Sequence, residues 1–365
     1  MINNKTIAVV IPAYNEEKQI IEVLDTMPEF VDRIVVVNDC SKDDTAALVL
    51  HYINRNKLNW QHTLIKKYKP IKSRYNRAEV VLYQMKETDL KYYISSEIVN
   101  STPETDRIIL INNLQNSGVG AAIARGYKWC LDNAIDCTAV MAGDGQMDPA
   151  ELESICKPVI EEGIDYVKGN RLIHRSAWLV MPRTRYLGNS LLSILTKIAS
   201  GYWHVSDTQT GYTAISLKAL ESIRIHDIYK SYGMPNDILV KLNIAFCTLK
   251  EVEIKPVYDI GEQSKMRIFK VIPKISWLLF KSFFKRLWIK YLFRDFHPLF
   301  LLYHFSFILG LFSIPFIIKI FRIWLEGGNV PSITMLVFTF LSISSFQSFL
   351  FAMWMDIQDN ERLYK

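Results

Sequence analysis

The sequence predicts an α/β fold with a mostly parallel sheet and helices on both faces, followed by a C-terminal region that enters a membrane. Short apolar runs alternate at least four times with segments in which apolar residues recur at helical spacing. This alternation is typical of βαβ units. Half of the 365 residues are hydrophobic, and the excess gathers after Phe296. The average hydrophobic content of the chain therefore combines a more polar N-terminal part with an apolar C-terminal part.

Each expected element follows from a local pattern. The strands are the apolar runs at 7–12, 33–39, 107–113 and 138–140. The helices are the periodic segments at 13–27, 41–53, 116–134 and 149–163. A polar stretch rich in Lys and Tyr, 66–106, interrupts the rhythm. It predicts a surface insertion, a helix and a hairpin, which either contacts a partner or acceptor or is a passive excursion.

The C-terminal third predicts membrane segments. Residues 265–297 carry nine Lys and Arg among apolar positions that repeat every three or four residues. We expect basic amphipathic helices there, suited to an anionic membrane surface. Two apolar runs, 298–318 and 332–355, are each long enough to cross a bilayer as a helix, so 298–355 predicts a transmembrane hairpin.

The distribution of basic residues predicts the topology. They are far denser before the first span than in the connecting loop, so the positive-inside rule places the N-terminal part in the cytoplasm. The expected organisation is a cytoplasmic catalytic domain, 1–264, the juxtamembrane helices, the hairpin, and a cytoplasmic tail, 356–365. The formal charge of +6 is clustered, which favours an anionic membrane surface, and no nucleic-acid partner is expected.

Several function classes are excluded by missing motifs. The five cysteines form no Cys-x-x-Cys, so neither a disulfide framework nor a zinc site is suggested. The first residues contain too short an apolar run for a signal peptide. A dinucleotide fingerprint beginning at Gly118 would need glycine at 123, where Ile123 stands. No P-loop, H-E-x-x-H or G-x-S-x-G motif occurs.

Polar residues follow three of the expected strands, as Asn38-Asp39, Asn112-Asn113 and Gly143-Asp144. Ligands of parallel sheets bind at the carboxyl ends of the strands, so these residues should line one cleft. In "MAGDGQMDP", a plain turn is the simple interpretation. The alternative is a site for Mg²⁺ or Mn²⁺, with Asp144 as the main ligand and Gln146 or Asp148 helping directly or through water. Such a metal would stabilise a departing diphosphate, which points to a nucleotide-activated donor.

Seven motifs together resemble those of family 2 glycosyltransferases, which have the GT-A fold, a Rossmann-like α/β architecture. They are "VVIPAYNEE", "VVVNDCSKDDT", "NSGVGAAIARG", "MAGDGQMDP", "VKGNRL", "DTQTGYTAIS" and "GEQSKM". They span about 1–270 apart from the insertion. The sequence most resembles the membrane-anchored branch, with dolichyl-phosphate mannose synthase and bacterial polyprenyl-phosphate glycosyltransferases.

The resemblance implies roles for the donor-binding residues. Pro12, Tyr14 and Glu16 would hold the base and ribose, and Asp39 would hydrogen-bond the base. Nearer the sugar, the implied residues are Asn116 and Gly120. Asp144 and Gln146 match metal-site positions, and Lys265 would reach the donor diphosphate. The first acid of the family's Asp-x-Asp is replaced by Ala142, which implies weaker metal binding or help from Asp148.

The resemblance also implies acceptor-side roles. Arg171 and Arg185 match basic positions that face the acceptor phosphate, whereas Arg183 and Arg185 could equally be an exposed helix start. Asn189 stands where the branch tends to have Ser. Asp207 and Asp237 are the later acids. Asp237 is either a general base for an acceptor hydroxyl or a helix cap.

Three functions remain open from the sequence. The first is an inverting glycosyltransferase that moves a sugar from a nucleoside diphosphate-sugar to undecaprenyl or dolichyl phosphate, for cell-surface glycan assembly. The second extends a lipid-linked glycan through a hydroxyl acceptor. The third is a non-catalytic membrane scaffold with a decayed nucleotide fold. The donor sugar and base are not readable, and a homo-oligomer is also open.

Overall fold

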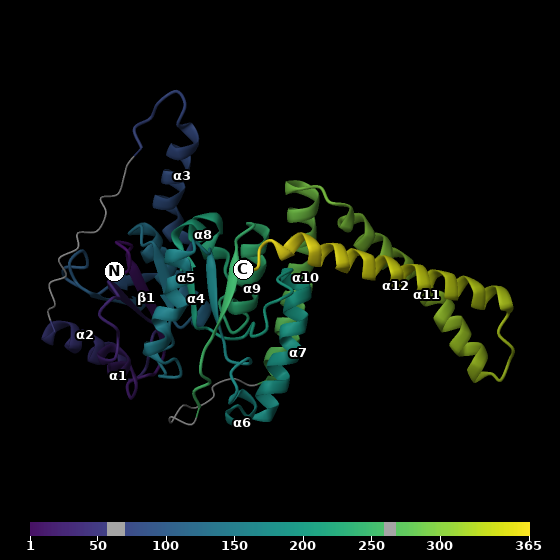
Figure 1. Ribbon diagram of the computed structural model, residues 1–365, viewed down its shortest axis with the longest axis horizontal. Coiled ribbons are helices and arrows are strands. Elements are labelled where there is room, and N and C mark those ends of the chain that lie inside the picture. Colours follow the sequence, from purple (N-terminus) through teal and green to yellow (C-terminus); the bar gives the residue numbers. More distant parts are fainter. Residues whose placement is uncertain (57–69, 259–267) are drawn as a thin grey trace.

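The computed structural model describes residues 1–56, 70–258 and 268–365. An α/β body carries at one side two long helices, α11 (Pro298–Leu325) and α12 (Ser332–Glu361), which project from it as a hairpin (Figure 1). The helices α7 (Arg183–Ser200) and α10 (Ile268–Trp288) lie side by side where the hairpin meets the body.

The body is built on one eight-stranded sheet with the order β3-β4-β2-β1-β5-β7-β6-β8. Its strands are β1 (Ile7–Ala13), β2 (Arg33–Asn38), β3 (Ser96–Ile98), β4 (Ile108–Asn113), β5 (Cys137–Val140), β6 (Tyr166–Asn170), β7 (Thr213–Ser216) and β8 (Leu249–Glu253). Only β3 and β7 run against their neighbours. The predicted mostly parallel sheet is therefore confirmed, and each expected strand is present within one or two residues of its predicted bounds.

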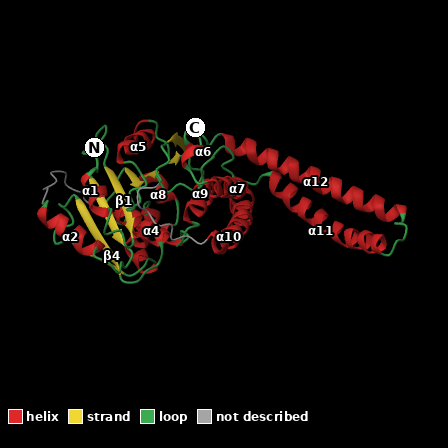
Figure 2. Cartoon of the chain, turned by 90° about the horizontal axis from the view of Figure 1, so that it is seen from below, coloured by secondary structure: helices red, strands yellow, loops and turns green. Residues whose placement is uncertain are grey.

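Helices cover both faces of the sheet (Figure 2). They are α1 (Ile20–Asp25), α2 (Thr45–Arg55), α4 (Val119–Asp132), α5 (Leu152–Glu161), α8 (Leu217–Ser222) and α9 (Met234–Ile244), with short 3-10 segments η2 (Pro149–Glu151) and η3 (Ile225–Asp227). Alternate strand residues point to opposite cores. Val10 packs toward α4 and α9, whereas Val9 and Ile11 pack toward α1 and α5. Because both faces are buried, the middle residues of the central strands β1 and β2 are apolar.

The insertion forms a helix, α3 (Arg77–Thr88), a 3-10 turn, η1 (Asp89–Tyr92), and the edge strand β3. The expected helix is present in the described part, whereas β3 pairs antiparallel with β4, which follows the insertion, and not with a strand inside it. α3 buries none of its residues. It protrudes from the body at the top of Figure 1.

The basic segment forms one helix, α10, which continues into the π-helical segment η4 (Ile289–Arg294) instead of two separate helices. A row at four-residue spacing, Ile275, Leu279, Phe283 and Leu287, is buried. Trp277 and Phe280 remain more than half exposed. Of the nine basic residues, Arg286 and Lys290 are fully buried, so they do not face a membrane surface.

The hairpin helices are long and apolar enough to cross a bilayer. Only 17% and 6% of their most apolar windows are buried, which excludes the core helix of a soluble domain. The two helices are joined by a reciprocal pair of hydrogen bonds: the Ser306 hydroxyl donates to the Ser345 carbonyl at 2.8 Å, and Ser345 donates to the Ser306 carbonyl at 2.9 Å. These bonds set their relative register.

A buried polar joint ties the hairpin to the body. Both guanidinium Nη atoms of Arg286 lie 2.7 Å from the two carboxylate oxygens of Asp356. Arg286 also donates to the carbonyls of Ile198 and Ala199 at the end of α7. The Tyr291 hydroxyl donates to Asp356 at 2.7 Å. Groups from α7, α10, η4 and α12 thus converge on one ion pair.

The C-terminal residues return to the sheet. Residues 356–361, expected in a tail, belong to α12, and Asp356 and Asn360 are buried. The Leu249 N–H donates to the Leu363 carbonyl at 2.7 Å, and Lys365 N–H donates to the Leu249 carbonyl at 2.9 Å. The free backbone edge of β8 explains this docking, because it offers unpaired groups to the chain end.

Candidate functional site

The loops after β1 and β2 are held together by side-chain to backbone hydrogen bonds. The Asn15 N–H donates to Ser41 Oγ at 3.0 Å, and the Glu16 N–H donates to Thr45 Oγ1 at 2.9 Å. Asn15 has a positive φ of 55°, a conformation that asparagine tolerates. Pro12, Tyr14 and Glu16 are half-buried in this region. The residues predicted to hold the base and ribose are therefore brought together at one end of the sheet.

Asp39 organises the same edge from within. Its carboxylate accepts from Asn113 Nδ2 at 2.9 Å, and from the N–H groups of Ser117 and Gly118, the latter at 2.7 Å. Only 3% of Asp39 is exposed. Its oxygens bind the turn that begins α4, so Asp39 builds the rim of the cleft, and its predicted contact to a base stays a prediction. Asn116, in that turn, is exposed.

Gly120 is explained by packing against the chain, because it lies beneath the segment before α9. Its N–H donates to the Lys230 carbonyl at 3.0 Å. A Cβ atom added at Gly120 would lie 2.1 Å from the Tyr229 carbonyl oxygen and 3.0 Å from the Cβ of Met234. Its predicted place near the nucleotide and sugar stays untested by this contact.

We expect Gly120→Ala to destabilise the fold. The added methyl group must push the start of α4 away from residues 229–230, at a cost of roughly 1–3 kcal/mol. Thermal unfolding followed by tryptophan fluorescence would measure the loss. Gly188→Ala is the control, because nothing lies within 4 Å of a Cβ at that position. Equal stability of both variants would contradict the packing interpretation.

The loop after β5 presents the candidate metal ligands. Asp144 Oδ1 accepts from the Gln146 N–H at 3.1 Å across Gly145, which has a φ of 75°. Both side chains are half-buried. A Cβ at Gly143 would lie 3.5 Å from the Pro12 carbonyl oxygen, so this loop lies beside the end of β1. The predicted cleft residues after β2, β4 and β5 therefore lie at one end of the sheet, together with the loop after β1.

The donor set fits a hard divalent cation that keeps open positions. Gln146 Nε2 is buried without a hydrogen-bond partner, and a 180° turn of this amide would place its oxygen there instead. Asp144 adds a carboxylate, and Mg²⁺ and Mn²⁺ prefer such oxygen ligands together with substrate phosphates. No cluster of three His, Cys, Asp or Glu occurs among the described residues. Substrate and water would complete the coordination.

Asp148 has a different place from Asp144. Its Oδ1 accepts from the Ala150 N–H at 2.9 Å and caps η2. Its other oxygen lies 3.6 Å from the Lys255 ammonium. The Tyr212 hydroxyl donates to the Asp148 carbonyl at 2.9 Å, which anchors the turn. The carboxylate of Asp148 thus binds a backbone N–H group, and this geometry does not favour direct metal ligation by Asp148.

Arg171 is paired inside the protein. Its Nε lies 2.8 Å and one Nη 3.2 Å from the two oxygens of Asp207, which is fully buried. Burial would raise the pKa of Asp207, but the Arg171 guanidinium holds this pKa below its usual range. The guanidinium of Arg171, which was predicted to face an acceptor phosphate, is instead bound to the carboxylate of Asp207.

A buried lysine lies under this pair. Lys168 is fully buried and donates to the Thr210 carbonyl. Burial lowers the pKa of Lys168 to about 8, although the carboxylates of Asp207 and Glu251 oppose the shift. Glu251 accepts from the N–H groups of Ser206 and Asp207. The buried side chains of Lys168 and Glu251 therefore fix the backbone of segment 206–210 by hydrogen bonds.

We expect Lys168 to make stability depend on pH. Below pH 8 the folded and unfolded chains both carry this proton, and the cost of burying the ammonium is present. Between about 8 and 10.5 the unfolded chain alone is protonated, so the free energy of unfolding rises with pH, by at most about 1.4 kcal/mol per pH unit. Unfolding of the wild type and Lys168→Met should diverge in this window. Parallel curves would contradict the assignment.

Asp237 lies in the first turn of α9 and is 7% exposed. It forms an ion pair with Lys241 and accepts from the Tyr229 N–H at 2.9 Å. It is not the N-cap of α9, which is Gly233. The carboxylate fastens the segment before the helix, and this geometry favours a structural role over that of a general base.

The remaining basic candidates differ in exposure. The guanidinium of Arg185, on α7, lies 5.6 Å from the ring centre of Tyr258, and that of Arg183 lies 5.8 Å from the ring of Trp178. Arg185 is half-buried and Arg183 is exposed, as is the start of α7. Asn189 is half-buried on the same helix. Lys265 lies outside the described residues.

The profile described as glycosyl transferase family 2 matches residues 8–69 and 59–224. The matched residues include the strand-end loops and the Arg171–Asp207 pair. The chain belongs to glycosyl transferase family 2. It is therefore a glycosyltransferase, and the scaffold alternative is not supported.

Three known proteins show what this glycosyltransferase is similar to. UDP-N-acetylglucosamine–dolichyl-phosphate N-acetylglucosaminyltransferase of Methanococcus voltae is 28% identical over 79% of this chain and 97% of its own length. Undecaprenyl-phosphate mannosyltransferase of Micrococcus luteus is 26% identical over 45% and 66%. Glucosyl-3-phosphoglycerate synthase of Mycobacterium tuberculosis, solved with uridine diphosphate, has a TM-score of 0.46 and 16% identity, covering 78% of this chain and 80% of its own.

Sequence reasoning missed the polar contacts that connect segment 206–210 and α9 to α7. The Thr196 hydroxyl and the Gln209 amide both donate to Asn236 Oδ1 at 2.8 Å. Ser193 and Thr208 hydroxyls lie 3.1 Å apart. Their local signal was weak, because Ser, Thr and Gln are common in loops and on helix surfaces. The contacts are made by residues distant in sequence and bring α7 against segment 206–210.

Proposed function

We propose that this glycosyltransferase moves a sugar from a nucleoside diphosphate-sugar to polyprenyl phosphate, of the dolichyl or undecaprenyl type, at the cytoplasmic face of a membrane. The observation that carries the proposal is the junction of site and membrane helices: segment 206–210 is hydrogen-bonded to α7, and α7 packs on α10 below the apolar hairpin. A lipid acceptor must present its head at such a junction.

The exposed side chains of α7 support the lipid acceptor. Leu187, Leu191 and Ile194 recur at helical spacing and are each more than half exposed. An exposed apolar row on a helix whose other face makes polar contacts suits the boundary between lipid headgroups and acyl chains. Two of the proteins named above, the enzymes of Methanococcus voltae and Micrococcus luteus, act by their names on dolichyl or undecaprenyl phosphate, which agrees with this acceptor class.

The state of the acids supports a phosphate acceptor. Asp207 is paired with Arg171, and Asp237 with Lys241. A sugar hydroxyl needs a base to remove its proton, whereas a phosphate oxygen is already anionic. The proposed step forms the bond from that oxygen to the anomeric carbon and breaks the bond from this carbon to the diphosphate. Attack opposite the leaving group inverts the anomeric configuration.

The residues of the chain have distinct parts in this step. A divalent cation bound by Asp144 and Gln146 would neutralise the charge that develops on the diphosphate. The loops after β1 and β2 orient the nucleotide. Arg185 is the better candidate for the acceptor phosphate, because the fork of Arg171 is occupied by Asp207. Lys265 is retained as a proposed diphosphate ligand.

The proposed orientation places the body and both hairpin ends on one side of the bilayer. Leu363 and Lys365 are hydrogen-bonded to Leu249 of the sheet, so α12 must return to the side from which α11 departs. The dense basic residues before α11 favour the cytoplasmic side.

A transfer assay with the full chain in vesicles tests the proposal. UDP- and GDP-sugars would be offered with polyprenyl phosphate or with a lipid-linked glycan, with Mn²⁺ or with a chelator. We expect a polyprenyl phosphate-sugar with inverted anomeric configuration, and loss of product with chelator. Transfer to the glycan hydroxyl alone would favour the alternative acceptor and would require a base, a role that the paired acids Asp207 and Asp237 do not fit.

A further inference from the structure

A hollow of about 520 Å³ lies where both ends of the hairpin meet the body. Its lining residues are Phe246, Arg294, Asp295, Arg362 and Leu363. Arg294 ends η4 just before α11 begins, and Arg362 directly follows α12. In the proposed orientation, the hollow therefore lies at the depth where the two helices enter and leave the bilayer, among the lipid headgroups.

Both arginines of the hollow have N–H groups left for an anion. The guanidinium of Arg294 donates to the Ile244 carbonyl at 2.6 Å and has no carboxylate partner among the described residues. The guanidinium of Arg362 lies 3.2 Å from Asp359, which also lies 3.2 Å from the Lys290 ammonium. Because a guanidinium carries five N–H donors, each arginine can bind further oxygens. Its forked donors match those of a phosphate.

Phe246 has a strained backbone in this hollow. Its φ is positive, 59°, which is rare for a bulky side chain. The centre of its ring lies 5.1 Å from the Lys290 ammonium and 5.8 Å from the Arg362 guanidinium. Strained residues of this kind cluster at ligand sites, and here the strain holds an aromatic ring beside two cations.

Exposed aromatic side chains next to the hollow favour a lipid over a free phosphate ion. Phe293 is 74% exposed and Phe296 is 61% exposed, and they flank Arg294 and Asp295 in the sequence. Apolar side chains beside cations suit the boundary between headgroups and acyl chains. A soluble ion would make no contact that needs them.

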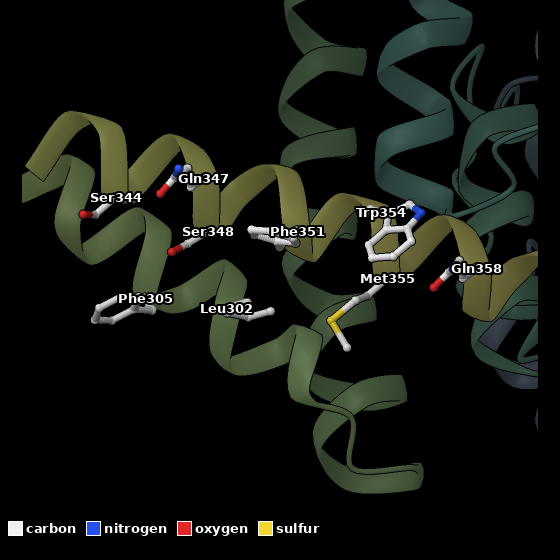
Figure 3. A pocket seen from close by; sticks show the side chains of 9 residues that line it. All are labelled: Leu302, Phe305, Ser344, Gln347, Ser348, Phe351, Trp354, Met355 and Gln358. Carbon is white, nitrogen blue, oxygen red and sulfur yellow. The ribbon is translucent and has the colours of Figure 1, made fainter. Parts of the chain in front are cut away.

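A groove between α11 and α12 provides room for a hydrocarbon chain. It has a volume of about 550 Å³, and its lining residues are uncharged (Figure 3). On α12 they include Ser348, Phe351 and, at the end nearest the body, Gln358. Arg362 follows Gln358 by four residues, a separation that places both on one face of a helix. The groove therefore leads along α12 toward the hollow.

From these observations we propose that the hollow binds the phosphate of an anionic phospholipid, with one acyl chain in the groove between α11 and α12. The lining residues carry two positive charges and one negative charge. A phosphate diester, which carries a single negative charge, would neutralise the excess. The inference depends on membrane insertion and is independent of sugar transfer.

The proposed lipid site is separate from the site of the proposed reaction. β8 runs parallel to β6, and Arg171 follows the end of β6. Phe246 precedes the start of β8, so the hollow lies at the opposite end of the sheet from the strand-end loops. A lipid bound there is therefore not the acceptor about to react.

Lipid binding to the full chain in detergent tests the site, with phosphatidylglycerol as the probe and native mass spectrometry as the readout. We expect Arg294→Gln/Arg362→Gln to raise the dissociation constant of the tightest-bound lipid at least about tenfold. Lys319→Gln/Arg322→Gln removes the same charge from exposed residues at the far end of α11 and should stay within about twofold. Equal effects of the two double variants, or no loss in the first, would overturn the proposal.

Asp295→Asn provides a test in the opposite direction. Asp295 is exposed and lines the hollow, so its carboxylate repels a phosphate. Its removal should lower the dissociation constant of phosphatidylglycerol by about two- to fivefold. Misfolding cannot produce a gain in affinity. Unchanged or weaker binding would show that the phosphate does not lie in this hollow.

The identity of the lipid is tested by competition and by filling the groove. Ser348→Trp should weaken phosphatidylglycerol binding about threefold or more, whereas Ile343→Trp, exposed outside the groove, should not. Phosphatidylethanolamine should bind more weakly than phosphatidylglycerol. Displacement by inorganic phosphate at equal concentration, a preference for phosphatidylethanolamine, or tighter binding of polyprenyl phosphate that requires Arg294 and Arg362 would each overturn the choice of an anionic phospholipid.

Discussion

Replacement of Asp144 by Asn is expected to lower sugar transfer by at least about 100-fold, because the amide removes the one carboxylate that the loop after β5 offers to a cation at the diphosphate. Ala142 stands two residues before Asp144, so that position offers no second carboxylate to the cation. Stability should change by less than about 0.5 kcal/mol, since Asp144 is half-exposed on a loop. Turnover with saturating donor, measured across a Mn²⁺ series, is the readout.

Asp148→Asn is the matched control for this prediction. It removes a charge four residues away, and asparagine preserves the cap of η2. We expect less than a tenfold loss of transfer. If both variants lost activity equally, the distinction between a ligand and a cap would be wrong. If Asp144→Asn retained full activity at low metal concentration, the proposed metal site would have to be abandoned.

The second large effect concerns the joint between body and hairpin. We expect Asp356→Leu to lower the free energy of unfolding by about 3–5 kcal/mol, because it leaves the fully buried guanidinium of Arg286 without its counter-charge. The same change should loosen the hairpin from α7. Thermal unfolding in detergent, with limited proteolysis of the segment before α11, would report both effects.

The double variant Arg286→Met/Asp356→Leu separates the charge from the packing. Removing both partners should recover most of the lost stability, since replacing a buried pair by apolar side chains is often neutral. Arg362→Met, at the exposed end of α12, is the control and should cost less than about 1 kcal/mol. A double variant as unstable as Asp356→Leu would indicate that the hydrogen bonds of Arg286 to α7 carry the effect.

The hairpin and the sheet illustrate what local pattern can predict. Residues 7–12 and 34–37 are apolar throughout because helices cover both faces of the sheet, and this signal is contained in a few consecutive residues. The polar residues at the ends of the strands predicted at 33–39, 107–113 and 138–140 were expected to share a cleft by a general rule of parallel sheets. The hydrogen bond from Asn113 to Asp39 agrees with that rule.

Pairings between distant residues could not be predicted in the same way. The sequence around Arg171 is the same whether its side chain binds a phosphate or Asp207. Likewise, the sequence around Asp237 does not distinguish a general base from an ion-pair partner of Lys241. The basic pattern before α11 likewise concealed that Arg286 and Lys290 are buried. Each of these outcomes depends on which side chain the fold brings within about 3 Å.

By itself the sequence determined the α/β body, the apolar hairpin, the family and the loop that carries Asp144, because periodicity and short motifs are properties of neighbouring residues. Only the tertiary structure decided which charges are neutralised inside the protein, how segment 206–210 is bonded to α7, and where α12 and the C-terminal residues dock. The physical reason is that ionic and hydrogen-bonding partners are selected by distance and burial in space, and these are set by the packing of elements far apart in the chain.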